Sequence, residues 1–335
     1  MNPENTIESS MQTVDPSFFE AARSGINRLV ENIQTVIIIQ RQKLEYIVAS
    51  RIAGGHVILA DSHGVGKTSL ARALAGSIDW GEAEVSREGV SIDHFSRIQC
   101  TVDLLPQDIL GFNRYDMSGG QHVFNRGPIF AHFILCDEIN LLTPKTQGSF
   151  FQAMEEGMVS IEGETYELPD PFFIIATMNL RGSHLFPLPA PQLDRFMTQI
   201  SLGYPAHESE LEILLKHGTD NSWKGFGPVV EVKELFAWQK LVDQVTASRE
   251  LVNYIVQIVR KTREYPGVVT GASPRAGIKL LRLARALALV RGMNYVTPDL
   301  IKELLVPCLA HRIELEDPSQ DAADMLEQVI KEVKV

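Results

Sequence analysis

Residues 55–78, GHVILADSHGVGKTSLARALAGSI, combine an apolar run, a polar loop that contains glycine, and the start of a helix. The apolar run at 56–60 has the length of one buried strand. Backbone N–H groups at such a loop and helix N-terminus bind phosphate, while the lysine reaches the β- and γ-phosphates and the threonine hydroxyl ligates Mg²⁺. The stretch therefore predicts a nucleotide site formed by His63, Gly64, Val65, Gly66, Lys67, Thr68 and Ser69.

Asp61 stands where the phosphate-loop pattern usually has its first glycine. A carboxylate that pointed into the loop would repel phosphate, at a cost on the order of several kcal/mol near a protein surface. We therefore predict that Asp61 turns away from the nucleotide, towards a backbone or side-chain donor. On that basis Asp61→Gly should change nucleotide affinity little.

Two acids, Asp137 and Glu138, directly follow the apolar run 133–136. Asp137 would hold Mg²⁺, through its water shell, opposite Thr68, and Glu138 would orient and deprotonate the attacking water. The alternative is a pair of solvated acids at the end of a strand. A phosphate loop upstream in the same predicted sheet favours the functional interpretation.

Three more polar residues are candidates because of their place along the chain. Asn179 ends the next apolar run, and it either hydrogen-bonds the γ-phosphate or the attacking water, or is a turn asparagine. Arg195 follows a proline-rich loop and either completes the site of a neighbouring subunit or forms a surface salt bridge with Asp194. Arg275 lies in the first turn of a predicted helix, where a cation is unfavourable, so it either has a phosphate partner or is solvent-exposed. With Glu138, these three are the predicted catalytic residues.

Apolar runs and turn residues predict an α/β fold in the first two thirds of the chain. Strands are predicted at 56–60, 91–99, 133–136, 172–177 and 197–202, and helices at 19–36, 41–53 and 144–156. Because strands alternate with helices, the sheet should be parallel, with its ligand at the carboxyl ends of the strands. A hairpin is predicted at 159–168, turning at Gly163-Glu164, whereas 100–128 is predicted to form loops with short helices.

The last third of the chain is predicted to be helical, without a convincing strand after residue 204. Helices are predicted at 207–216, 232–246, 249–264, 274–291, 298–310 and 320–333. Ser273-Pro274 and Thr297-Pro298 each place an N-cap residue before a proline at the first helical position. The predicted organisation is a flexible segment at 1–18, a nucleotide-binding core at 19–205 and a helical lid at 206–335.

Composition limits the class of protein further. A net charge of −11 and an isoelectric point near 5.3 argue against nonspecific duplex binding as the main role. The sequence has no apolar run long enough to span a membrane, and its first residues do not resemble a signal peptide. Cys100, Cys136 and Cys308 are widely spaced, which is typical of reduced core cysteines, so we expect a cytoplasmic protein.

Several segments, in this order, resemble the MoxR family of AAA+ ATPases. They are GGHVILAD, DLLPQDILG, GPIFAHFILCDEIN, PKTQGSFFQAMEEG, FFIIATMN, PLPAPQLDRF and GASPRA, and the resemblance covers roughly 25–312. It implies an AAA+ P-loop αβα core with a parallel five-stranded sheet, followed by an all-α lid. It also implies Walker A at 61–68, Walker B at 134–138, a helix-2 insert within 103–125 and a pre-sensor hairpin at 159–168.

The same resemblance implies roles for the candidate residues. Asn179 would be sensor 1, Arg195 an arginine finger and Arg275 sensor 2. The cofactors implied are ATP or ADP with Mg²⁺, the latter held by Thr68 and Asp137. The sequence departs from the family pattern at Asp61 and at Leu141, where DEIN is usually followed by arginine.

We therefore predict a Mg²⁺-dependent ATPase, a chaperone or remodelling protein that activates or matures a protein partner. The resemblance implies a hexameric ring and a partner with a von Willebrand factor A domain. Two alternatives stay open at this point: a nucleotide-gated scaffold with little turnover, and a nucleic-acid motor, which the acidic charge disfavours. Adenine should lie between core and lid, and hydrolysis should change the angle between them.

Overall fold

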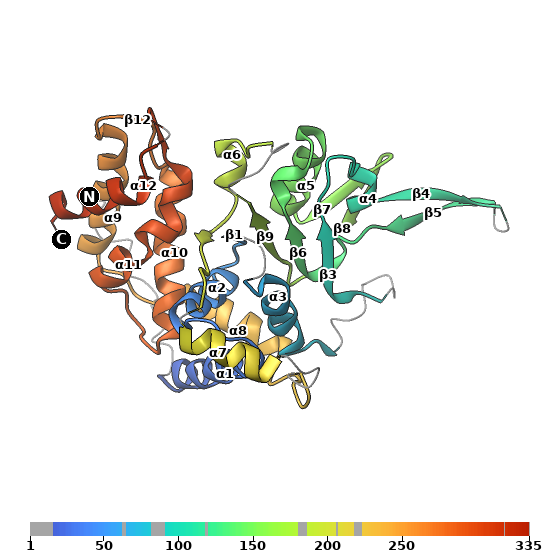
Figure 1. The fold of residues 1–335 in the computed structure, drawn as a ribbon, viewed down its shortest axis with the longest axis horizontal. Coiled ribbons are helices and arrows are strands. Elements are labelled where there is room, and N and C mark those ends of the chain that lie inside the picture. Colours follow the sequence, from blue (N-terminus) through green and yellow to red (C-terminus); the bar gives the residue numbers. More distant parts are fainter. Residues whose placement is uncertain are drawn as a thin grey trace, which may run out of the picture.

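A computed structural model shows an α/β core beside a group of helices (Figure 1). The structure describes residues 16–61, 65–81, 91–117, 120–179, 186–205, 207–217, 223–317 and 319–334. The predicted flexible segment at 1–18 lies almost wholly outside these residues. The predicted core–lid boundary near 205 stays a prediction.

Five parallel strands form the central sheet, in the order β10-β1-β9-β6-β3. They are β1 (Val57–Ala60), β3 (Asp93–Gln99), β6 (Ala131–Asp137), β9 (Phe173–Met178) and β10 (Thr198–Ile200). All five strands and the predicted parallel arrangement are confirmed. The register pairs Gln99 with Asp137 and Leu59 with Thr177, so the polar ends of β3, β6 and β9 meet beside the loop that follows β1.

Helices cover the sheet and form the lid. The longer ones are α1 (Pro16–Val36), α2 (Arg41–Ile52), α3 (Lys67–Gly76), α5 (Pro144–Glu156), α7 (His207–His217), α8 (Val232–Val242), α9 (Arg249–Glu264), α10 (Pro274–Val290), α11 (Pro298–Leu309) and α12 (Ala322–Glu332). The short ones are α4 (Pro106–Leu110), α6 (Ala190–Leu193), η2 (Ile139–Leu141) and η3 (Ala310–Arg312). Ser273 and Thr297 accept the predicted N-cap hydrogen bonds. None of the helices in the described ranges is long and apolar enough to cross a bilayer.

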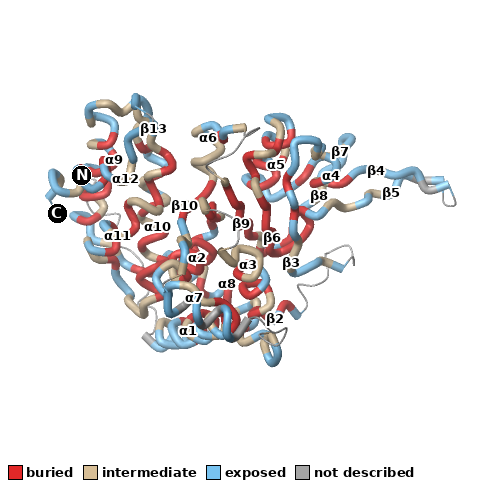
Figure 2. The backbone as a smooth tube through the Cα atoms, viewed as in Figure 1, coloured by how far each residue is buried: buried red, intermediate tan, exposed pale blue. Residues whose placement is uncertain are grey.

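The segment 100–128 differs from its prediction. After α4 it forms a hairpin of β4 (Gly111–Asp116) and β5 (Gln121–Arg126) instead of loops with short helices. The hairpin extends away from the sheet, and most of its residues are exposed (Figures 1 and 2). Phe124 packs against Phe130 and Tyr166, but most of the other described residues of the hairpin are exposed, so its strands lack the apolar alternation by which a half-buried strand is identified. Phe112, Tyr115, Met117 and Val123 are its exposed large apolar side chains.

The second hairpin, β7 (Met158–Ile161) with β8 (Glu164–Glu167), is present where the sequence predicts one. Its register is shifted, because the turn is Glu162-Gly163 and Val159 pairs with Tyr166. Both turn residues have positive φ, 53° and 90°, as a primed two-residue turn requires. The predicted turn at Gly163-Glu164 is therefore wrong by one residue.

Short strands also occur in the last third, where the sequence predicts none. β11 (Val230–Glu231) pairs with β2 (Ile78–Asp79), and β12 (Val268–Thr270) pairs with β13 (Glu314–Leu315). Strands of two or three residues are too short to show a hydrophobic period. The lid is otherwise helical, as predicted.

The two faces of the sheet belong to two hydrophobic clusters. One cluster, on the side of α5, contains Ile58, Ile134 and Ile174. The other contains their neighbours Leu59 and Leu135, and it continues without a break through α1, α2 and α3 into helices α8 to α12. We call this larger cluster the shared core. It joins the sheet and the lid in one packed interior.

A half-buried polar group reinforces the contact between α2 and the lid. Glu303 on α11 accepts hydrogen bonds from Tyr46 Oη (2.8 Å), Gln42 Nε2 (2.9 Å) and both terminal nitrogens of Arg291. Arg291 also pairs with Glu45 at 3.1 Å. Burial alone would raise the pKa of Glu303, but the hydrogen bonds from Arg291, Gln42 and Tyr46 outweigh it and lower that pKa to about 2.

The lowered pKa of Glu303 predicts that the stability of the fold falls at acidic pH. Because the pKa of Glu303 is lower in the folded protein, its contribution to the free energy of unfolding is complete above pH 4.5 and is lost as the pH falls towards about 2. We expect Glu303→Gln to be less stable than the parent by about 2 kcal/mol at neutral pH. Urea unfolding at a series of pH values should show this gap close on acidification. A gap that stays constant down to pH 2 would contradict the assignment.

Candidate nucleotide site

A pocket lies at the carboxyl ends of β3, β6 and β9, next to the N-terminus of α3. The residues that line it are Gly66, Lys67, Thr68, Ser69, Arg97, Gln99, Asp137, Glu138 and Thr177. The predicted phosphate-binding lysine and threonine thus face the two predicted acids across one cavity. His63 and Gly64 lie outside the described residues.

The start of α3 is suited to an anion. Gly66 is the N-cap, with φ of +84°, a conformation that side chains other than glycine rarely adopt, and the cap makes no side-chain hydrogen bond. The first N–H groups of the helix and the positive end of its dipole point into the pocket region. Lys67 Nζ donates to Asp61 O at 2.9 Å. Burial lowers the pKa of Lys67, and the charges of Asp61, Asp137 and Glu138 oppose that shift.

Asp137 is buried and held from two sides. Its Oδ2 pairs with Arg97 Nε at 2.6 Å, and its Oδ1 accepts a long contact, 3.4 Å, from Thr177 Oγ1. Sequence reasoning missed Arg97 and Thr177. Arg97 lies two residues before the end of β3, opposite Leu135, and its side chain reaches Asp137 on the neighbouring strand, a contact that no local sequence pattern indicates.

Glu138 has a left-handed backbone, with φ of 56° and ψ of 53°. This conformation is uncommon for glutamate, costs about 1–3 kcal/mol and persists only where the surrounding structure imposes it. Here Thr177 Oγ1 accepts a hydrogen bond from Glu138 N at 2.8 Å, which fixes the turn after β6. The strained turn carries the side chain into the lining of the pocket, as a group that acts on water requires.

A second pocket adjoins the first and shares Gly66 with it. Its lining residues are Ile37, Ile38, Ile39, Gln40, Val65, Gly66, Leu70, Leu202, Gly203, Tyr204 and Pro205. The walls are largely apolar, and they come from the α1–α2 connection on one side and the β10–α7 connection on the other. An apolar slot beside a phosphate site suits a nucleotide base. Sequence reasoning identified Val65 and Gly66 but not the two connections.

The prediction that Asp61 turns away from the phosphate loop is confirmed. Its carboxylate accepts hydrogen bonds from Ser201 Oγ (2.7 Å), Leu202 N (2.5 Å) and Gly203 N (3.2 Å). These three residues, which we call the linker turn, belong to the connection between β10 and α7. The charge of Asp61 is thereby satisfied by donors outside the phosphate loop.

Asn179 lies one residue beyond β9, and its backbone carbonyl accepts a hydrogen bond from Asn140 Nδ2 at 2.9 Å. Among the described residues that line the phosphate-side pocket, β9 is represented by Thr177. The role of Asn179 as sensor 1 therefore stays a prediction.

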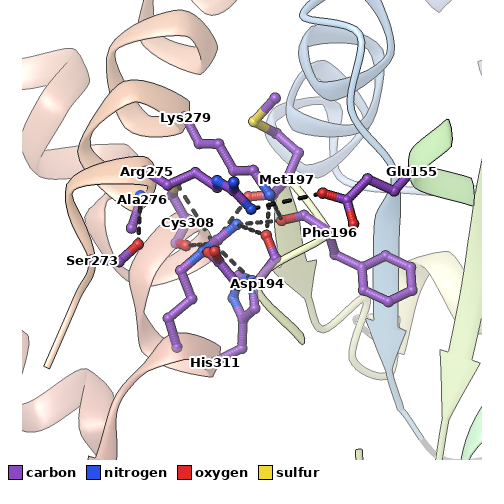
Figure 3. A network of polar contacts seen from close by, with 11 residues as sticks. Glu155, Asp194, Phe196, Met197, Ser273, Arg275, Ala276, Lys279, Cys308 and His311 are labelled. Atoms are coloured by element: carbon purple, nitrogen blue, oxygen red, sulfur yellow. Dashed lines mark hydrogen bonds and ion pairs between the residues drawn. The ribbon is translucent and has the colours of Figure 1, made fainter. Parts of the chain in front are cut away.

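Arg195 and Arg275 meet at one carboxylate, Glu155 on α5. Arg195 contacts it at 2.9 Å and Arg275 at 3.7 Å. Figure 3 shows Arg275 extending from the lid towards Glu155. The predicted alternative, a salt bridge from Arg195 to Asp194, is wrong, because Asp194 pairs with Arg312 at 2.7 Å. Neither Arg195 nor Arg275 is among the described residues that line the two pockets of its own chain.

The backbone that carries Arg195 is fixed by two cations of the lid. Arg312, almost fully buried, donates to the carbonyls of Asp194 and Phe196 as well as to the Asp194 carboxylate. Lys279 donates to the carbonyl of Asp194, and burial followed by the nearby charge of Arg312 lowers the pKa of Lys279 to about 8. These contacts surround Asp194 in Figure 3. Contacts from Lys279 and Arg312 thus fix the position of the backbone on both sides of Arg195.

Comparison with known proteins agrees with this geometry. The family described as ATPase family associated with various cellular activities (AAA) matches residues 56–198, and the AAA lid domain matches residues 260–333. The chain is similar to the uncharacterized protein YeaC of Bacillus subtilis, with 37% identity over 92% of both chains. It is also similar to the chaperone MoxR1 of Mycobacterium tuberculosis, with 34% identity over 87% of this chain and 76% of that protein.

The fold has a close counterpart among solved structures. A protein from Cytophaga hutchinsonii, described only provisionally as an ATPase, superposes with a TM-score of 0.84 and 31% identity. The match covers 95% of this chain and 97% of the other. The core and the lid therefore occur together in a protein of known structure.

Proposed function

Because this chain belongs to the MoxR family of AAA+ ATPases, we propose that it hydrolyses ATP and uses the cycle to remodel a protein client. The observation that carries the proposal is the pocket in which Lys67 and Thr68 face Asp137 and Glu138. In this proposal Gly66, Lys67, Thr68 and Ser69 bind the phosphates, and the adjoining apolar pocket takes the base.

Mg²⁺ fits the residues at this site. Hydroxyl and carboxylate oxygens are the ligands that it prefers, and Thr68 and Asp137 supply one of each in the same pocket. Bound there with the nucleotide, the ion would neutralise charge that develops on the β- and γ-phosphate oxygens. Glu138 would orient the water and accept its proton, while Arg97 and Thr177 hold Asp137 in place.

We propose that Arg195 and Arg275 act on the nucleotide of a neighbouring subunit. Support comes from their shared position on Glu155, apart from the described residues that line the phosphate-side pocket and the adjoining apolar pocket. Head-to-tail contacts of this kind are heterologous and close into a ring when the rotation fits. A hexamer and a von Willebrand factor A-domain partner stay predictions of the family resemblance, and a cytoplasmic location stays a prediction from the spacing of the cysteines.

The proposal is tested by removing the lysine of the phosphate loop. Lys67→Ala should lose most of its ATP affinity, at least about a hundredfold, because the loop then lacks its positive side chain beside the phosphates. Titration calorimetry with ATP and Mg²⁺ measures this loss. Lys302→Ala, which removes an exposed lysine paired with Asp299 on α11, is the matched control and should bind as the parent does. Tight ATP binding by Lys67→Ala would refute the assignment of the site.

A further inference from the structure

The Asp61 carboxylate accepts hydrogen bonds from two backbone N–H groups in a distant part of the chain. These donors are the N–H groups of Leu202 and Gly203, and the Ser201 hydroxyl donates a third hydrogen bond. Hydrogen bonds to a charged acceptor are stronger than those between neutral groups. The side chain therefore holds the linker turn in one conformation, although the turn is 140 residues further along the chain.

The opposite side of the linker turn is held as well. Lys43 Nζ, on α2, donates to Leu202 O at 2.7 Å. Gly203 has φ of +67°, a left-handed conformation that glycine adopts without strain. The carboxylate of Asp61 thus accepts hydrogen bonds from two N–H groups of the turn, and the ammonium of Lys43 donates one to its carbonyl.

The linker turn also forms one wall of the apolar pocket. Leu202 and Gly203 line that pocket, and Tyr204 and Pro205 continue the same wall. The backbone of Asp61 belongs to the phosphate loop, where its carbonyl accepts from Lys67. One residue therefore contacts the phosphate-binding lysine through its main chain and the base-side wall through its side chain.

We propose that Asp61 is a positioning residue that fixes the base-side wall relative to the phosphate loop, so that adenosine and triphosphate meet one preorganised site. The proposal rests on the proposed function, because it assigns the apolar pocket to the nucleotide base. It replaces the expectation that Asp61→Gly changes nucleotide affinity little. Without the carboxylate, two amides of the linker turn lose their acceptor, and binding must order the wall at its own cost.

The contributions of the base-side wall and of the phosphate loop to binding can be measured separately with two ligands. ATP needs both parts of the site, whereas inorganic tripolyphosphate needs the phosphate loop alone. In Asp61→Asn, ATP should bind roughly tenfold to a hundredfold more weakly. Tripolyphosphate should bind as tightly as to the parent, or more tightly, because the variant has lost a negative charge near the loop. Calorimetry of the full chain with Mg²⁺ and each ligand gives both constants.

Two further variants complete the experiment. Asp317→Asn is the matched control, because Asp317 also accepts from a serine hydroxyl and a backbone N–H, those of Ser319, but lies in the lid away from both pockets. It should bind both ligands as the parent does. Lys43→Met releases the other side of the linker turn and should weaken ATP but not tripolyphosphate, which tests the proposal even if Asp61→Asn does not fold.

The proposal is overturned if Asp61→Asn binds ATP and tripolyphosphate more weakly by the same factor. It is also overturned if neither Asp61→Asn nor Lys43→Met binds ATP more weakly than the parent. Failure of the proposed function would look different. In that case the parent would not bind ATP, or Lys67→Ala would bind it unchanged, whatever happens at Asp61.

Discussion

Arg195→Ala is expected to bind ATP as the parent does and to hydrolyse it about 10³–10⁵-fold more slowly. The arginine contacts Glu155 and is not among the described residues that line the two nucleotide pockets, so its loss should not disturb binding there. Its planar fork would instead stabilise transition-state charge on the nucleotide of the next subunit. Steady-state phosphate release, with calorimetry for binding, measures both parts of the prediction.

Arg28→Ala is a suitable control, because Arg28 also forms an ion pair, with Glu234, on another part of the surface. It should leave turnover unchanged. If the arginine acts in trans, turnover per protomer of the parent should also rise with protein concentration. An Arg195→Ala protein that hydrolyses ATP at the parent rate would show that Arg195 is not the finger.

The second large effect is expected at Glu138. Glu138→Gln should keep its ATP affinity but lose about 10²–10⁴ in turnover, because only the group that takes the proton from water is altered. Glu162→Gln is the matched control, since Glu162 also has a left-handed backbone but lies in the β7–β8 turn. A parent with measurable phosphate release that Glu138→Gln abolishes excludes the nucleotide-gated scaffold. Unchanged turnover in Glu138→Gln would remove this residue from the mechanism.

Mixing the two inactive proteins tests the geometry between subunits. Rings that contain both Arg195→Ala and Glu138→Gln chains have interfaces where an intact Arg195 faces an intact Glu138. Activity should therefore return on mixing. If mass measurement shows mixed rings and the mixture stays inactive, simple complementation in trans is wrong.

Apolar runs made the central sheet predictable. β6 and β9 are buried on both faces, so their sequences are continuous apolar segments that end at polar residues, and those ends locate the pocket. The P-loop lysine, the two acids at the end of β6 and the N-caps of α10 and α11 follow from local patterns of the same kind. Local patterns decide these positions because each depends on neighbours within a few residues.

Contacts between distant segments were not predictable in the same way. Arg97 reaches Asp137 across a strand pair, Asp61 reaches the linker turn, and Glu155 collects two arginines from different elements. Nothing near these residues in sequence indicates the partner. The β4–β5 hairpin was missed for a different reason: Phe124 packs against a hydrophobic cluster, but most of the other described residues of the hairpin are exposed, so its strands show no apolar period.

The shared core has a consequence for how the molecule holds together. Sheet residues such as Leu59 and lid residues such as Leu304 belong to one uninterrupted apolar interior. Because this apolar interior is continuous across residue 205, we expect the sheet and the helices that follow it to unfold in one cooperative transition. A cavity introduced on α11, for example by Leu304→Ala, should then lower the stability of the region around the phosphate loop as well.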